Sequence, residues 1–384
     1  MSSTRFNSPI YRQSMNKSNE NLLYNTNNPP SNTEQVTFIN CTHMYCVCFV
    51  DIVDSTKNTC DINGSDKIRG YYSVFLNTMS SIIKKHNGRV IKNSGDGLLY
   101  YFPKTVDSKN ELAFQDVIDC GLAMIDANKS INQTFTQKGL SSVYYRISAN
   151  YGEVELAISV NSYNVDLFGP PVNVCSKINH LASPNGMIVN SDLFEILKST
   201  SFYQEYSFKA LEKNCDGSVK SNYIAYSVHP IDDVSKRKEI EDKKKRQFIE
   251  SQQNHRKLTN SFFNILLIDD DEDILFTFNS IISSEGYNVT SFSSSLNALT
   301  HFSDKNPYFY HLVIMDIRMP ELNGIKLYAQ LKVLNPDVKV LFLSALNALD
   351  EVLSIFPEIK TTEIIRKPIE PDSLLSNIKS ILCR

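Results

Sequence analysis

The sequence predicts two folded domains of different classes. The first is an α+β domain with a split βαββαβ core of the ferredoxin-like kind, over residues 36–230. The second is a doubly wound α/β domain over 261–384. Three observations support this division: strand patterns combined with one amphipathic helix and a glycine hairpin come first, wholly apolar strands ending in polar residues come last, and a charged stretch separates them at 231–260.

The first domain is expected to follow a segment without regular structure. Residues 1–35 are rich in Asn and Ser and show no helical or alternating pattern, which predicts disorder. A strand over 36–52 comes next, then a helix over 65–86 whose apolar face carries Ile68, Tyr72, Phe75, Met79 and Ile82. The pattern continues with a hairpin turning at 94–97, a helix around 112–128, a strand at 144–150, a helix that bears Asn173 and Lys177, and strands that end near residue 228.

Two carboxylates stand where an apolar strand gives way to small polar residues. Asp51 follows Cys48-Phe49-Val50, and Asp96 lies in the hairpin Ser94-Gly95-Asp96-Gly97. A lone Asp at a strand end most often caps the next helix or turn. Two of them in succession favour a site for two divalent ions, because hard oxygen ligands suit Mg²⁺ or Mn²⁺.

These segments resemble the opening strand and the Lys-x-x-Gly-Asp hairpin of class III nucleotidyl cyclases, and residues 166–177 resemble that family's Asp-x-x-Gly-x-x-Val-Asn-x-x-x-Arg segment. The resemblance implies that two Mg²⁺ or Mn²⁺ ions are bridged by Asp51 and Asp96. By the same resemblance the Ile52 carbonyl is a further metal ligand, and the backbone N–H groups from Val53 to Thr56, together with Ser55 and Thr56, contact the phosphates. Asn173 would orient the ribose, and Lys177 would occupy the position of the transition-state residue.

Base recognition by the same resemblance falls to Lys92 and Asp166. A donor beside an acceptor matches the N1 and N6 edge of adenine, so ATP is the expected substrate and cyclic AMP the product. Lys177 departs from the family Arg and loses its bidentate geometry, which would lower activity. Lys213 is a candidate for binding the terminal phosphates of the nucleotide. A homodimer is expected, because in the family two catalytic domains complete each site.

Two alternatives to an adenylate cyclase stay open at this point. One is a degenerate cyclase-like domain that serves as a phosphorylation-controlled scaffold, a reading that Lys177 favours. The other is a guanylate cyclase, which Lys92 and Asp166 disfavour.

In the second domain, polar residues follow each of four apolar strands. The strand at 264–268 runs into Asp269-Asp270-Asp271, the strand at 312–315 into Asp316, the strand at 340–343 into Ser344, and the strand at 363–365 into Arg366-Lys367-Pro368. Ligands bind at the carboxyl ends of the strands in open parallel sheets. These residues therefore predict one site.

This order resembles the flavodoxin-like receiver domain of response regulators. The resemblance implies that Asp316 is the phosphoacceptor and that Mg²⁺ is held by Asp269, Asp270 and the Arg318 carbonyl. Ser344 and Lys367 would contact the phosphoryl group. Ile364 stands where many receivers place a switch aromatic residue, and a cluster that binds Mg²⁺ without being phosphorylated is the alternative. A separate histidine kinase is the expected phosphodonor.

Composition limits the other functions. A formal net charge of −3 gives no reason to expect nucleic-acid binding. Eight scattered Cys lack zinc spacing, which favours free thiols in a reducing cytoplasm. No apolar run approaches the roughly 20 residues that span a bilayer, so we expect a cytoplasmic protein. The charged stretch at 231–260 predicts a solvated helical linker, with a weak dimerising helix as the alternative.

Overall fold

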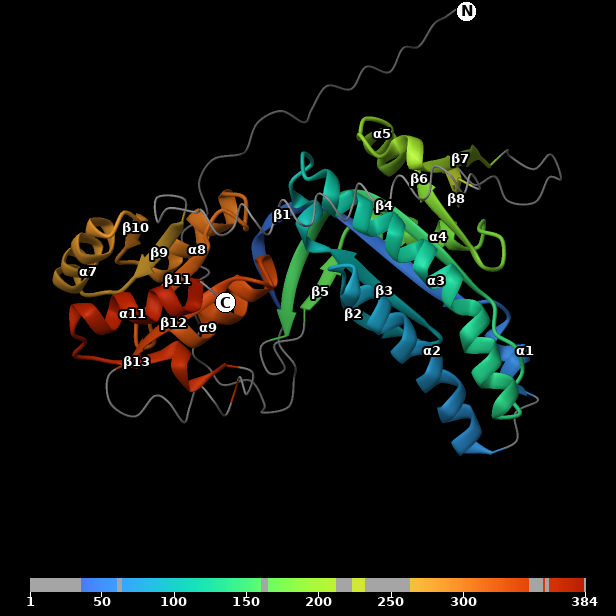
Figure 1. Cartoon of the computed structure of the whole chain (residues 1–384), viewed down its shortest axis with the longest axis horizontal. Coiled ribbons are helices and arrows are strands. Elements are labelled where there is room, and N and C mark those ends of the chain that lie inside the picture. The colour runs from blue at the N-terminus through green and yellow to red at the C-terminus, as the bar shows by residue number, and fades with distance from the viewer. Residues whose placement is uncertain are drawn as a thin grey trace, which may run out of the picture.

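A computed structural model describes residues 36–60, 64–159, 165–211, 223–231, 263–344, 355 and 359–382. The N-terminal segment at 1–35, the charged linker apart from residue 231, and Lys213 lie outside the described residues. Two sheets confirm both predicted fold classes, one mixed α+β sheet and one parallel α/β sheet (Figure 1). The three boundaries between the four predicted segments stay predictions.

The first sheet has eight strands in the order β2-β3-β1-β4-β6-β8-β7, with β5 paired to β4. All of its pairings are antiparallel except that of β4 with β6. The strands are β1 (Val36–Ile52), β2 (Arg89–Ser94), β3 (Gly97–Phe102), β4 (Tyr145–Ser159), β5 (Val165–Phe168), β6 (Gly186–Asn190), β7 (Tyr206–Ala210) and β8 (Ala225–Pro230). The helices of this part are α1 (Ser55–Cys60), α2 (Ser65–Lys85), α3 (Glu111–Gln137), α4 (Pro170–Asn179) and α5 (Ser191–Lys198).

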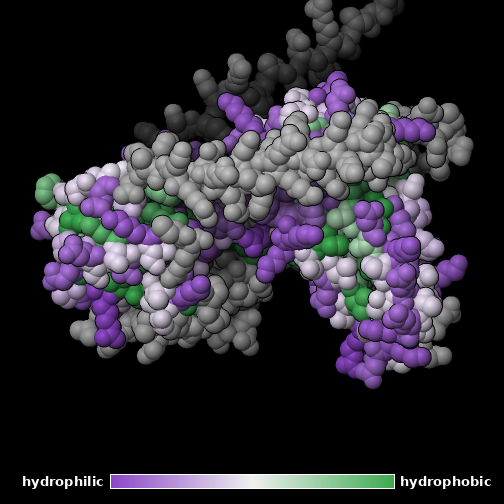
Figure 2. Space-filling model, in the orientation of Figure 1, coloured by the Kyte–Doolittle hydropathy of each residue, from purple (hydrophilic) through white to green (hydrophobic). Residues whose placement is uncertain are grey.

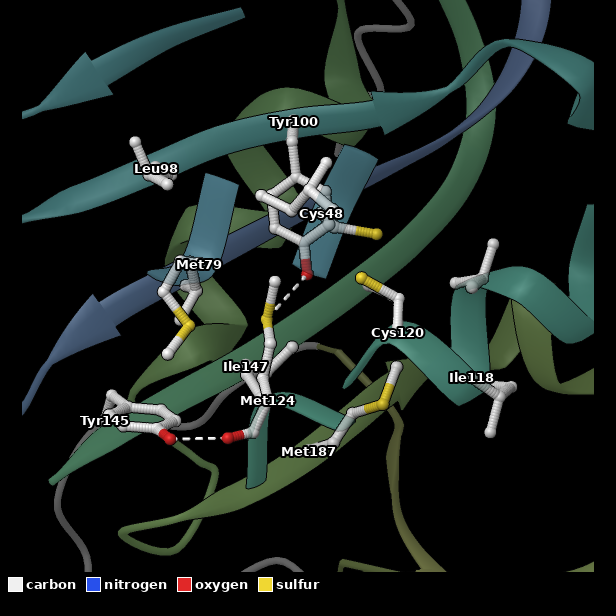
Figure 3. Packing of buried hydrophobic residues seen from close by; sticks show 14 of the residues in the cluster. Cys48, Met79, Leu98, Tyr100, Ile118, Cys120, Met124, Tyr145, Ile147 and Met187 are labelled. Atoms are coloured by element: carbon white, nitrogen blue, oxygen red, sulfur yellow. Dashed lines mark hydrogen bonds between the residues drawn. The ribbon is translucent and has the colours of Figure 1, made fainter. Parts of the chain in front are cut away.

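The two faces of this sheet have different partners. Side chains alternate along a strand, so Cys46, Cys48 and Val50 of β1 point into the core beneath α2 and α3. Figure 3 shows that core, where the Tyr100 and Tyr145 hydroxyls both donate to atoms of Met124. The intervening residues of β1 face the other side of the sheet.

The helix expected at 65–86 forms as α2, but its buried stripe differs from the prediction. Tyr71, Phe75, Met79 and Ile83 are buried, whereas Ile68, Tyr72 and Ile82 are half-buried at the edge of the stripe. α3 and β4 are also longer than expected: α3 buries Ile131 and Phe135 beyond residue 128, and β4 pairs with β1 as far as Ser159.

The second sheet has five parallel strands in the order β10-β9-β11-β12-β13. They are β9 (Asn264–Ile268), β10 (Asn288–Phe292), β11 (Leu312–Asp316), β12 (Lys339–Ser344) and β13 (Ile364–Arg366), with helices α7 (Glu272–Ser284), α8 (Ser295–Asp304), α9 (Gly324–Leu334) and α11 (Pro371–Leu382). Sequence patterns predicted four of these strands and missed β10, because its residues Asn288–Phe292 include three polar side chains and form no apolar run.

No helix among the described residues is both long enough and apolar enough to span a membrane.

Candidate functional site

Strand pairing brings the two predicted metal-binding carboxylates of the first domain together. Asp51, the penultimate residue of β1, lies directly opposite Gly97, the first residue of β3, and Asp96 precedes Gly97 in the turn. Burial raises the pKa of Asp51 to about 7, and the charge of Asp96 adds to that rise. Two carboxylates this close repel each other unless a proton or a cation lies between them.

The donor set at this turn fits a hard divalent cation. A Cβ atom built on Gly97 would lie 2.8 Å from Asp51 Oδ1. Because glycine has no side chain, the Asp51 carboxylate can occupy this position without a clash. Within the described ranges, no group of three or more His, Cys, Asp or Glu side chains is arranged to hold a metal ion. The two carboxylates would therefore need backbone or substrate oxygens to complete the coordination.

Arg146 is a neighbour of Asp51 that the sequence analysis missed. The residue lies on β4 directly across from Asp51, and its charge works to lower the pKa of Asp51. Its Nε is buried and has no hydrogen-bond partner. The register between β1 and β4 creates this pairing, and no local sequence motif carries it.

One predicted phosphate contact is wrong. The backbone N–H of Val53 donates to the Tyr144 carbonyl at 2.8 Å, so it is already used within the sheet. Ser55 and Thr56 begin the six-residue helix α1, with Ser55 half-buried and Thr56 exposed. The backbone expected to face phosphates is therefore limited to residues 54–56.

The two predicted base-reading residues form an ion pair. Lys92 on β2 and Asp166 on β5 lie 74 positions apart, yet Lys92 Nζ lies 2.9 and 2.8 Å from the two Asp166 carboxylate oxygens. Both side chains are partly exposed, so a ligand can reach the donor and the acceptor from solvent.

α4 presents the remaining predicted residues of this site to solvent. Asn173 and Lys177 are one turn apart and both exposed. Buried Asn179, which the sequence analysis missed, fixes the helix by donating to the Phe49 carbonyl and to Ser148 Oγ, each at 3.2 Å. The Cys175 thiol lies against the same two strands.

Asp51 and Lys92 lie on the sheet face opposite α2 and α3. Register places Asp51 in the same alternating row as Phe49, which pairs with Leu99, and Leu99 pairs with Lys92. α4 covers part of this face. The structure thus places Asp51 on the same face as Lys92, which pairs with Asp166, and beneath α4, the helix that carries Asn173 and Lys177.

The second candidate site lies at the carboxyl ends of β9, β11 and β13. Lys367 Nζ lies 2.6 Å from Asp269 and 3.0 Å from Asp316, and both carboxylates are buried. Burial works to lower the pKa of Lys367, but hydrogen bonds and charges from the two acids together raise it. The ammonium therefore stays charged. Two carboxylates and one ammonium leave a net negative charge that suits Mg²⁺.

The other predicted residues of this cluster surround it. Asp270 is exposed, Ser344 is buried, and the Arg318 N–H donates to Asp316 at 2.9 Å. Asp271 has a structural role instead, because its side chain caps α7 by accepting from the N–H groups of residues 273 and 274. The peptide bond between Lys367 and Pro368 is cis.

Two sequence families match this chain in succession. Residues 39–229 match the family described as "Adenylate and Guanylate cyclase catalytic domain", and residues 265–379 match the "Response regulator receiver domain".

Curated relatives resemble one half of the chain or the other. The transcriptional regulatory protein CssR of Bacillus subtilis is 31% identical over 121 residues, which are 31% of this chain and 51% of that protein. A putative adenylate cyclase 3 of Rhizobium meliloti is 27% identical over 117 residues, which are 30% of this chain and 17% of that protein. The chain therefore spans about half or less of the length of these relatives.

Solved structures of cyclases also align with the chain. The guanylyl cyclase Cya2 aligns at 18% identity with a TM-score of 0.42, over 50% of this chain and 95% of that one. The adenylyl cyclase CyaB from P. aeruginosa aligns at 16% identity with a TM-score of 0.43, over 51% of this chain and 96% of that one.

Proposed function

Because the chain belongs to the class III nucleotidyl cyclases and carries a receiver domain after its catalytic domain, we propose that it converts ATP to 3′,5′-cyclic AMP and pyrophosphate under the control of receiver phosphorylation. The observation that supports ATP over GTP as the substrate is the ion pair between Lys92 and Asp166. Adenine presents the acceptor N1 beside the donor N6, and guanine presents the reverse order. A lysine donor beside a carboxylate acceptor fits the adenine edge.

The carboxylates of Asp51 and Asp96 would hold two Mg²⁺ or Mn²⁺ ions. When bound, such ions supply charge compensation for the triphosphate and lower the pKa of the ribose 3′-hydroxyl. The residues themselves bind and orient the substrate: Lys92 and Asp166 hold the base, and Asn173 positions the ribose one turn from Lys177 on α4.

Two cations are candidates for contacting the phosphates. Arg146 faces Asp51 across the strands, with its Nε unpaired, and is the candidate from the metal-binding side. Lys177 is the candidate on α4. An ammonium is a point charge and cannot make the planar two-bond contact of an arginine, so Lys177→Arg is expected to raise the rate.

Two copies of the chain would complete each site. Asp51 and Asp96 would come from one copy, and Lys92, Asp166, Asn173 and Lys177 from the other. The exposure of Asn173 and Lys177 supports this arrangement, because both remain available to a partner.

The receiver would accept a phosphoryl group on Asp316 from a histidine kinase, with Mg²⁺ held by Asp269 and Asp270. Lys367 supports this role because it already bridges Asp269 and Asp316 and can pair with the added charge.

Incubation of purified full-length protein with ATP or GTP and Mn²⁺, followed by chromatography, tests the proposal. Cyclic AMP that disappears in Asp51→Ala is the expected result. Cyclic GMP in place of cyclic AMP would overturn the choice of base, and no cyclic product from either nucleotide would favour the scaffold alternative.

A further inference from the structure

Helix α9 of the receiver domain is buried on nearly every side. Of its eleven residues, Lys326 alone is exposed, and Gln330 and Lys332 are half-buried. A helix that packs on one sheet normally keeps a polar face toward solvent, so a second body must cover α9. Strand β4 of the cyclase domain provides that cover, because α9 lies against it and one apolar cluster joins Val154 and Leu156 to the helix.

Charged and aromatic side chains lie at the edge of the contact between the receiver and the cyclase domain. Asp337, which follows α9, accepts from the Arg89 guanidinium at 2.6 Å and lies 3.7 Å from Lys104 Nζ. The same ammonium stands 5.9 Å above the ring centre of Tyr308. Tyr101 of β3 is fully buried nearby, and burial together with the Asp337 charge raises the pKa of its hydroxyl. Figure 2 shows hydrophilic residues where the two domains meet.

The receiver occupies the same sheet face as the candidate catalytic residues. Tyr101 pairs with Val47, and Val47 and Asp51 stand in one alternating row of β1. Four residues along a strand span roughly 13 Å. The contact therefore lies on the sheet face away from α2 and α3, toward the end that is far from Asp51 and beside the predicted base-reading residues. Arg89 is three positions before Lys92 on β2, and Leu156 pairs with Leu167, the neighbour of Asp166. Figure 1 shows the receiver beside the start of β1 and β5, with α1 at the other end of the sheet.

We propose that the receiver domain docks in cis on the catalytic face of the cyclase domain and competes there with a second copy of the chain. The competition rests on the proposed function, in which two copies complete each site. The closed chain is monomeric and low in cyclase activity, and opening it frees the face for pairing. Asp337 and Tyr308 precede β12 and β11, whereas Asp316 is the last residue of β11, so the ion-paired part of the contact and the phosphorylation site lie at opposite ends of these strands. Phosphorylation therefore acts on the contact through the packing of the receiver domain.

Zero-length cross-linking tests the docking itself. A water-soluble carbodiimide joins an amine to a carboxyl group with loss of one water, and Lys104 and Asp337 are close enough to react. We expect their linked tryptic peptide from the full-length wild type and none from Lys104→Arg, which keeps the charge but has no primary amine. A mixture of ¹⁵N-labelled and unlabelled chains should give unmixed linked peptides. Absence of this peptide, or mixed labels, would overturn docking in cis.

Charge reversal at Asp337 tests the competition. Exposed ion pairs are weak, so we expect Asp337→Lys to lower the closed-to-open ratio about five-fold, which equals about 1 kcal/mol. The dimer fraction, measured by sedimentation across a range of protein concentrations, should rise accordingly. Asp126→Lys is the matched control, because it makes the same charge change on the exposed side of α3, which covers the other face of the sheet.

The outcomes separate this inference from the proposed function. A higher dimer fraction in Asp337→Lys than in Asp126→Lys supports the competition even if no nucleotide is cyclised, in which case the proposed function alone fails. Equal dimer fractions in the two variants, with the cross-link present in the wild type, would refute the competition whatever the cyclase rate.

Discussion

Replacing Gly97 by Ala disturbs the candidate metal site without removing a carboxylate. The new Cβ would stand 2.5 Å from the Val50 carbonyl oxygen, 2.8 Å from Asp51 Oδ1 and 3.1 Å from the Phe49 ring. Val50 and Asp51 belong to the paired strand β1, so relief requires the β1–β3 ladder or the Asp51 carboxylate to move.

The expected cost follows from these contacts. Overpacking a well-packed position costs about 1–3 kcal/mol, and the upper half of that range applies because the nearest atom is a backbone carbonyl. For a domain of this size the change lowers Tm by about 5–10 °C. Displacement of Asp51 should also weaken Mn²⁺ binding and cyclisation by about ten-fold or more.

Thermal unfolding followed by circular dichroism, with calorimetric titration of Mn²⁺, measures both effects. Gly70→Ala is a control within α2, where a Cβ meets nothing within 4 Å, so helix propensity should make it neutral or stabilising. Gly95→Ala strains the same turn through its φ of 68° but touches nothing, and should destabilise without a direct contact to Asp51. Gly97→Ala with the wild-type Tm and the wild-type Mn²⁺ affinity would refute the packing described at this turn.

Three further predictions concern base choice, phosphorylation and pH. Lys92→Glu combined with Asp166→Ser should lower the ATP-to-GTP ratio of kcat/KM by about ten-fold or more, because the adenine edge loses both partners; an unchanged ratio would mean that the base is read elsewhere. Phosphoramidate with Mg²⁺ should label the wild type but not Asp316→Ala, and should change the dimer fraction or the cyclic AMP rate; labelling without either change would contradict regulation in cis. Mn²⁺ affinity should rise with pH through about 7 and level off above it, because the pKa of Asp51 is about 7 without metal and only its carboxylate binds; equal affinities by calorimetry well below and well above that pH would contradict the assignment.

Local sequence was sufficient for features that depend on a strand and the turn after it. The position of Asp51 at the end of β1 and of Asp96 in the hairpin follows from the apolar run and the small residues beside it. The same holds for Asp269 and Asp316, each at the end of a buried parallel strand. Hydrophobic period and turn chemistry specify these positions without knowledge of the partner strand.

Features that depend on register or on a second body could not be predicted. Arg146 faces Asp51 only because β4 pairs with β1 in one particular register. The Val53 N–H is used because the Tyr144 carbonyl lies beside it. The burial of α9 on both sides needs the cyclase sheet, and its apolar residues alone do not identify what covers them.

Mixing two inactive variants tests the central claim most directly. Asp51→Ala lacks a metal ligand, and Asn173→Ala lacks the ribose contact, so each homodimer should be inactive. In a mixed dimer one site takes Asp51 from one chain and Asn173 from the other and is intact. Random pairing at equal amounts makes half of the dimers mixed with one intact site in two, so about a quarter of the wild-type cyclic AMP rate should return. A mixture of folded variants that stays inactive would contradict a cyclase site built from two copies of this chain.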